Sequence, residues 1–177
     1  MLKRSMVFME FVSKADDYDR ITVNWKGYNV GFRFLIDKGG TDLRSVVITK
    51  DLATQMNLSE VELYKLAREN TPRLFPIKLG GMTEILFGFP DPDEKMFILT
   101  NDDGMNGAVT ILYPDAMETI KAKIPGHFYM IPSSVHELIL LPDNGDMSED
   151  EINDIINQVN TGYVDPADQL GNEVLYF

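Results

Sequence analysis

The 177-residue chain has no cysteine and only two histidines, His127 and His136. Without cysteine it forms no disulfide and offers no thiolate for zinc binding or nucleophilic catalysis. The phosphate-binding glycine loops of nucleotide-binding proteins and the His-Glu-x-x-His zinc motif are also missing. On two paired strands the histidines would lie too far apart to share one ion. We therefore predict no metal site and no cofactor.

Long apolar runs are missing as well, since no segment approaches the roughly 20 residues that span a bilayer. The first residues place Lys3 and Arg4 before an apolar run, as a signal peptide does, but Glu10 interrupts that run. We instead expect an N-terminal helix and no membrane partner. The absence of cysteine fits a cytoplasmic protein.

Positive charge is absent from the last part of the chain, because no lysine or arginine follows Lys123. The first 123 residues contain all 16 basic residues and 18 acidic ones, and the last 54 contain the other 10 acidic residues. The net charge is −12. An acidic surface repels a phosphate backbone, so we expect no nucleic-acid partner and a solvated acidic face.

The first half predicts a β-hairpin over residues 21–37, a strand over 45–49 and a short helix over 51–56. Ser59 and Glu62 have the spacing of a capping box, which predicts a second helix that ends at Pro72. Glycine and proline repeatedly interrupt residues 75–95. We interpret that segment as a connection. It would join an N-terminal part, residues 1–90, to a C-terminal part, residues 91–177, within one compact domain.

The C-terminal part predicts an α+β fold. Its expected strands cover residues 95–100, 107–113, 127–132 and 136–142, and its expected helices cover residues 114–124 and 148–160. This β-β-α-β-β-α order, with short loops inside each strand pair, predicts an antiparallel sheet with helices on one face. Ser148 and Glu151 cap the last helix, whose apolar stripe is Ile152, Ile155, Ile156 and Val159.

The segment "IPSSVHELILLP" brings Ser134, His136 and Glu137 close together in sequence. A catalytic triad needs the acid and the nucleophile on different nitrogens of one imidazole. Adjacent positions of a strand point to opposite faces, so His136 and Glu137 do not meet that need. We interpret the two serines as a structural turn. A hydrolase that uses Ser134 or His136 with a distant acid is kept as an alternative.

Residues 51–69 have the outline of a helix-turn-helix, which gives a second alternative, a DNA-binding regulator. Their second helix carries Glu60, Glu62 and Glu69 against Lys65 and Arg68. A recognition helix is usually basic. We therefore favour an ordinary pair of helices that packs on the sheet.

Residues 45–177 resemble a bacterial family of unknown function, domain-of-unknown-function family 5688. The resemblance is carried by the run "TN…NGA…LYPD…PSS-HE…LP". This run contains the candidate binding or structural residues Asn101, Asn106, Gly107, Ser133, Ser134, His136 and Glu137. The resemblance implies a cytoplasmic module, often encoded near mobile-element genes, with no assigned catalytic residues.

The strand order also predicts where the candidate residues lie. If residues 107–113 form a descending strand, the loop from Asn101 to Asn106 lies at one end of the sheet. Ser133 and Ser134 then lie at the other end, beside the start of helix 114–124, as a structural clamp or an anion-binding corner. We predict a non-catalytic binding or interaction module whose partner is an unknown protein or small ligand.

Overall fold

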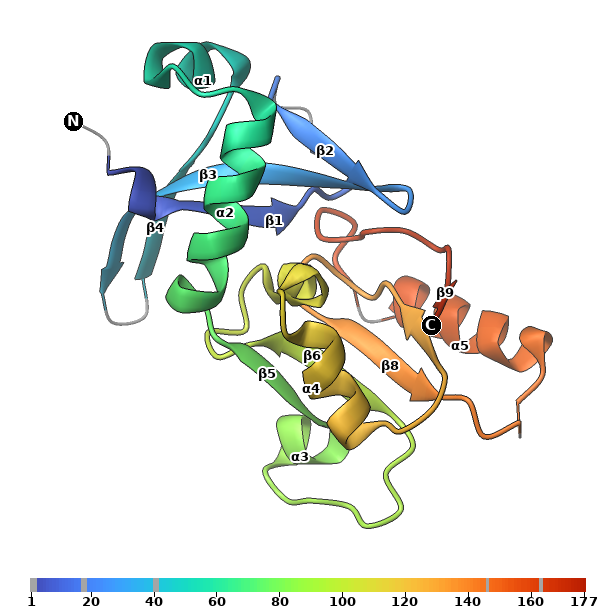
Figure 1. Ribbon diagram of the computed structural model, residues 1–177. Helices are drawn as coiled ribbons and strands as arrows, with labels where there is room; N and C mark the ends of the chain where they lie inside the picture. The colour runs from blue at the N-terminus through green and yellow to red at the C-terminus, as the bar shows by residue number, and fades with distance from the viewer. Residues whose placement is uncertain (1–2, 17–18, 40–41, 146, 163) are drawn as a thin grey trace.

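The computed structural model describes residues 3–16, 19–39, 42–145, 147–162 and 164–177. Two antiparallel sheets and the helices packed on them confirm the predicted α+β class (Figure 1). The helix α2 leads from the first sheet to β5 at the edge of the second (Figure 1). Within the described ranges, no helix has the length and apolarity that crossing a membrane requires.

The first sheet is built around one long strand, β3, which pairs with its three neighbours. The strands are β1 (Val7–Phe11), β2 (Thr22–Trp25), β3 (Tyr28–Gly39) and β4 (Asp42–Val47). Lys26 and Gly27, both at positive φ, form the two-residue turn between β2 and β3. This turn matches the right-handed twist of the strands, and the predicted hairpin is confirmed.

The expected N-terminal helix is wrong, because residues 7–11 form β1 after a single 3-10 turn, Arg4–Met6. All five residues of β1 are buried, including Glu10. The Glu10 carboxylate accepts hydrogen bonds from Arg20 Nη1 at 2.7 Å and Arg33 Nη1 at 3.2 Å. A strand buried on both faces lacks the alternation of apolar and polar residues by which strands are usually identified. The charged Glu10 can lie inside such a strand because two arginines bind its carboxylate.

The helices α1 (Lys50–Met56) and α2 (Glu60–Leu74) confirm the next predictions. Ser59 Oγ accepts from the Glu62 backbone N–H, and the Glu62 carboxylate accepts from the Ser59 backbone N–H. Pro72 does not end α2, which continues for two more residues. In the last turn its missing N–H removes one hydrogen bond while the preceding turns hold the helix.

The second sheet has the strand order β5-β6-β8-β7-β9. Its strands are β5 (Ile77–Gly81), β6 (Phe97–Asn101), β7 (Phe128–Ile131), β8 (Leu138–Pro142) and β9 (Leu175–Tyr176). Residues 75–95 are therefore not a plain connection, since they contain β5 and the helix α3 (Met82–Phe87). Gly80 and Gly81 pack closely against side chains, because an added Cβ would lie 2.9 Å from Ile85 or Glu94 and would require that side chain to shift.

The predicted strand 107–113 is also wrong, because residues Gly107–Leu112 form a 3-10 helix, η2. The observed order is β6-η2-α4-β7-β8-α5, with α4 at Ala116–Lys123 and α5 at Glu149–Gly162. All six residues of η2 are buried. A fully buried apolar run of this length carries no period that separates a strand from a helix.

Helices cover both faces of the second sheet and not one. On β8, Leu138 and Leu140 join the cluster that contains Ile120 of α4. The alternate residues Ile139 and Leu141 join the cluster that contains Ile152 and Ile156 of α5. Because neighbouring strand residues point to opposite faces, α4 and α5 lie on opposite sides of the sheet.

The last helix keeps the predicted cap and most of the predicted stripe. Ser148 and Glu151 exchange the two hydrogen bonds of a capping box. The bond from the Ser148 backbone N–H, helped by its hydroxyl, holds the pKa of Glu151 below its usual value. Ile152 and Ile156 are buried and Ile155 is half-buried, while the Val159 side chain lies outside the described part.

Candidate functional site

The seven candidate residues gather at one end of the second sheet, where β6 ends and β8 begins. The Asn106 backbone N–H donates to Nδ1 of His136 at 3.1 Å. Next to it, the Ala108 N–H donates to the Val135 carbonyl at 3.2 Å. The prediction that the Asn101–Asn106 loop and the two serines lie at opposite ends is therefore wrong.

The error follows from the helical residues 107–112. Between β6 and β7 the segment made of η2 and α4 runs from one end of the sheet to the other once. The predicted strand and helix would have run this length twice. β7 therefore runs in the same direction as β6, and both pair antiparallel with β8. The turn after β7 lies beside the end of β6. The serine hydroxyls proposed for the clamp at the start of α4 donate to Glu137 instead. The side chain of Asp115, the N-cap residue of α4, makes no capping hydrogen bond.

Asn101 and Asn106 shape the loop between them. Asn101 accepts from the Asp103 N–H at 3.1 Å and donates to the Met105 carbonyl at 2.8 Å. Asn106 has a left-handed backbone, with φ 52°, and its amide donates to Glu10 Oε2 at 2.9 Å. The loop is thereby tied to the buried carboxylate of the first sheet. These contacts indicate a structural role for both asparagines.

Ser133, Ser134 and Glu137 form a compact hydrogen-bonded turn. Both hydroxyls donate to Glu137 Oε1, Ser134 at 2.9 Å and Ser133 at 3.3 Å. Ser134 Oγ also accepts from the His136 backbone N–H at 3.0 Å. The serine hydroxyl thus meets the backbone of His136 and not its imidazole. This is the predicted structural turn.

His136 does have a distant acid, because its Nε2 lies 3.4 Å from Asp168 Oδ2. Its Nδ1 accepts from a backbone N–H, which fixes the proton of the neutral ring on Nε2, facing Asp168. A general base needs its free nitrogen on a nucleophile. Both nitrogens of His136 are occupied by groups that are not nucleophiles, so the arrangement orients a loop and does not assemble a triad.

The two histidines lie at opposite ends of the β7–β8 pair. His127 contacts the Phe177 carbonyl at 3.0 Å, whereas His136 contacts the loop after β6. In the ranges that the structure describes, no three histidine or acidic side chains group as metal ligands do.

A groove of about 590 Å³ lies on the α5 side of the second sheet. Its floor is the middle of the sheet, where Ile98 of β6 pairs with Ile139 of β8. The helices α3 and α5 form its sides. The apolar lining consists of Met82, Ile85, Leu86, Met96, Ile98, Ile139 and Ile155. Its volume falls within the range of about 300–1,000 Å³ that is typical of ligand sites.

The groove has a polar end beside the loop that follows β6. This end is lined by Thr100, Gly104, Ser133, Glu137 and Gln158. Two candidate residues, Ser133 and Glu137, therefore line the groove. Sequence reasoning missed its other side, because Met82, Ile85 and Leu86 belong to the segment interpreted as a connection. Their helical spacing was the available signal.

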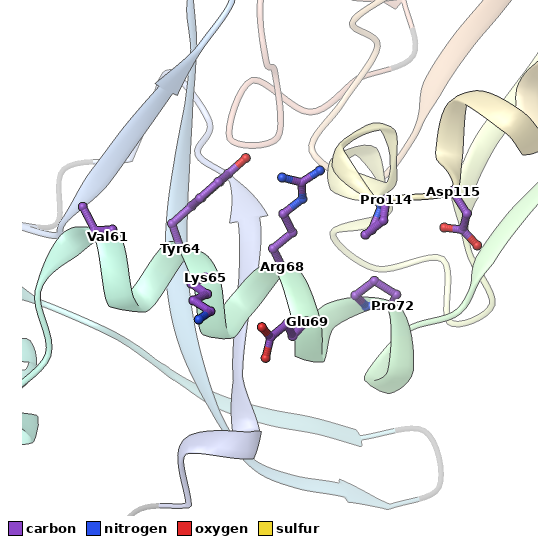
Figure 2. Close-up of a pocket in the computed structure, with 8 residues that line it drawn as sticks. All are labelled: Val61, Tyr64, Lys65, Arg68, Glu69, Pro72, Pro114 and Asp115. Carbon is purple, nitrogen blue, oxygen red and sulfur yellow. The ribbon is translucent and has the colours of Figure 1, made fainter.

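A second, more open pocket of about 770 Å³ lies along the outer side of α2. Figure 2 shows Tyr64 and Arg68 pointing one way from this helix and Lys65 and Glu69 the other. The charges on it are mixed, with Asp115 on the far wall. This surface lacks the basic face that the DNA-binding alternative requires.

Comparison with known protein families places the chain. The model of a family of unknown function, DUF5688, matches residues 21–177. The chain therefore belongs to this family, and the resemblance seen in its sequence is confirmed. No curated protein and no solved structure matches it.

Proposed function

We propose that this member of DUF5688 is a non-catalytic binding module that holds an apolar segment of a partner protein in the groove between α3 and α5. The observation that carries the proposal is the groove itself, with seven apolar side chains and one polar end. Each large apolar side chain that enters such a site contributes about 1.5–3 kcal/mol when it leaves water.

The apolar surface continues outside the groove, which favours a protein over a small ligand. Leu86 on its side wall is 59% exposed, and Phe87 and Phe89 are 69% and 58% exposed. The two phenylalanine rings stack with their centroids 6.2 Å apart. Clustered exposed apolar side chains mark interaction surfaces, because a monomer gains nothing by leaving them in water.

The hydrogen bonds of the seven candidate residues support a non-catalytic role. The serine hydroxyls are bound to Glu137 and the imidazole of His136 to Asn106 and Asp168. These contacts fix the shape of the polar end. In a hydrolase, one of these groups would have to contact the reacting atom of the substrate or the proton that is transferred.

The proposal is tested with a synthetic 18-residue helix that has leucine on one face and glutamine on the other. Fluorescence anisotropy measures its binding to the wild type, to Leu86→Asp and to Val61→Asp. Val61 is 77% exposed on α2, so its substitution makes the same chemical change away from the groove. We expect Leu86→Asp to weaken binding by about tenfold or more and Val61→Asp to leave it unchanged. Equal effects of the two variants, or no binding to the wild type, would contradict the proposal.

A further inference from the structure

We infer that the partner segment is a basic amphipathic helix, with a lysine or arginine that reaches Glu137 at the polar end of the groove. This inference rests on the proposed function and names the chemistry of its partner. It is carried by the charge of the lining and by the position of the floor within the sheet.

Of the described residues that line the groove, Glu137 is the one that is ionisable. Its Oε1 accepts from both serine hydroxyls. Within the described part of the chain, its Oε2 has no hydrogen-bond or ion-pair partner. The groove lining that the structure describes contains no lysine or arginine, and the His136 ring is directed to Asn106 and Asp168. A carboxylate beside an apolar floor therefore lacks a counter-charge.

A cationic group completes this site, and an anionic one is repelled by it. The attraction between unit charges is several times stronger beside a low-dielectric floor than in water. An apolar ligand with a carboxylate head, such as a fatty acid, would place like charges together. A lysine or arginine also buries its methylene stem along apolar surface while its head reaches the carboxylate.

The rim of the groove on α5 is acidic as well. Helical spacing places Glu151 one turn before Ile155, and Asp154 one turn before Gln158, on the side of α5 that lines the groove. Both acids are exposed. The helix α5 contains no lysine or arginine. A partner with several basic residues beside its apolar face would meet Glu137 inside the groove and Asp154 at its rim. The Glu151 carboxylate, which accepts from Ser148, adds negative charge next to them.

The floor favours a helix over an extended peptide. β6 and β8 form the floor, and β5 and β7 pair with their outer sides. The backbone groups of both floor strands are thus used inside the sheet. An added strand needs a free sheet edge, whereas a helix satisfies its own backbone and inserts only side chains. Such a helix presents apolar residues at positions i, i+3, i+4 and i+7.

The experiment compares two synthetic helices with the same leucine face, one with lysine on its polar face and one with glutamine. Their dissociation constants are measured against the wild type, Glu137→Gln and Asp51→Asn. Asp51 is an exposed acid on α1, so its substitution removes the same charge at a distance from the groove. Glutamine at position 137 keeps an oxygen for the two serine hydroxyls, and circular dichroism checks that each variant is folded.

We expect the lysine helix to bind the wild type about tenfold more tightly than the glutamine helix. Glu137→Gln should remove most of this difference and leave the glutamine helix unaffected, while Asp51→Asn should preserve it. Equal losses in the two variants would show general attraction to an acidic protein and overturn the inference. If the two helices bind equally, the inference fails and the proposed function survives, whereas no binding of either helix defeats both.

Two other occupants are outcomes of the same test. Sedimentation of the protein alone would reveal a dimer, and a dimer that Leu86→Asp separates would assign the groove to a second copy. Binding of dodecylammonium without binding of either helix would assign it to a small cationic amphiphile. Either result would overturn the assignment to a basic helix.

Discussion

Gly107 lies where β6, η2 and the turn before β8 meet. An added Cβ would lie 2.6 Å from the Asn101 backbone nitrogen, 2.7 Å from the His136 carbonyl oxygen and closer still to Thr100 Oγ1. Two of these three atoms belong to the backbone and have no rotamer by which to move away. Glycine at this position lets the loop that holds the candidate residues close against the sheet.

The substitution Gly107→Ala should therefore destabilise the protein by about 3 kcal/mol, since overpacking against backbone atoms forces segments apart. Gly39→Ala is the matched control, because its added Cβ would lie 3.7 Å from the nearest atoms, those of Asp37. Urea denaturation measures both variants. A midpoint for Gly107→Ala equal to that of Gly39→Ala would show that the three segments are not packed as described.

The sequence identified the residues of this site but not their arrangement. The sequence predicts a turn at Ser133 and Ser134, and it rejects a triad because His136 and Glu137 face apart on a strand. Their closeness to Asn106 depends on the path of residues 107–112, which contacts far along the chain determine. The side of the groove formed by α3 was missed because glycine and proline suggested a loop.

Among the elements, those with local signals were predicted well. The capping boxes that begin α2 and α5 involve residues three positions apart, so their hydrogen bonds are visible in the sequence. Two of the errors fall on β1 and η2, short runs in which every residue is buried. Burial on all sides removes the apolar period, and the partner elements then determine whether the run is extended or helical.

The helix α5 offers the sharpest test at this scale. Ile156 is buried against the second sheet, whereas Asn153 of the same helix is exposed. Ile156→Asp should lower the free energy of unfolding by roughly 3–5 kcal/mol, because it removes apolar contacts and buries an unpaired charge. Asn153→Asp introduces the same residue on the solvent side and should leave stability nearly unchanged. Equal melting temperatures for the two variants would mean that α5 is not docked on the sheet.

At the scale of the whole molecule, one cluster of buried side chains joins the two sheets. It includes Val30 and Phe32 of the first sheet with Leu99 and Leu138 of the second. A polar link runs beside it, from Glu10 in β1 to Asn106 in the loop after β6. Since neither sheet can expose this shared core without loss, we expect the chain to unfold as one unit.

Trp25 makes this expectation measurable, because it is the single tryptophan and lies in the first sheet, beside Phe11. Its fluorescence reports on the first sheet and on its stacking with Phe177, whose ring centroid lies 6.4 Å away. The methyl resonances of Ile152 report on the far side of the second sheet. Both signals should give the same urea midpoint. The decisive comparison uses Ile156→Asp, which damages only the second sheet. In one cooperative unit it lowers the Trp25 midpoint as far as the Ile152 midpoint. A Trp25 midpoint that stays at the wild-type value would divide the molecule into two independently stable parts.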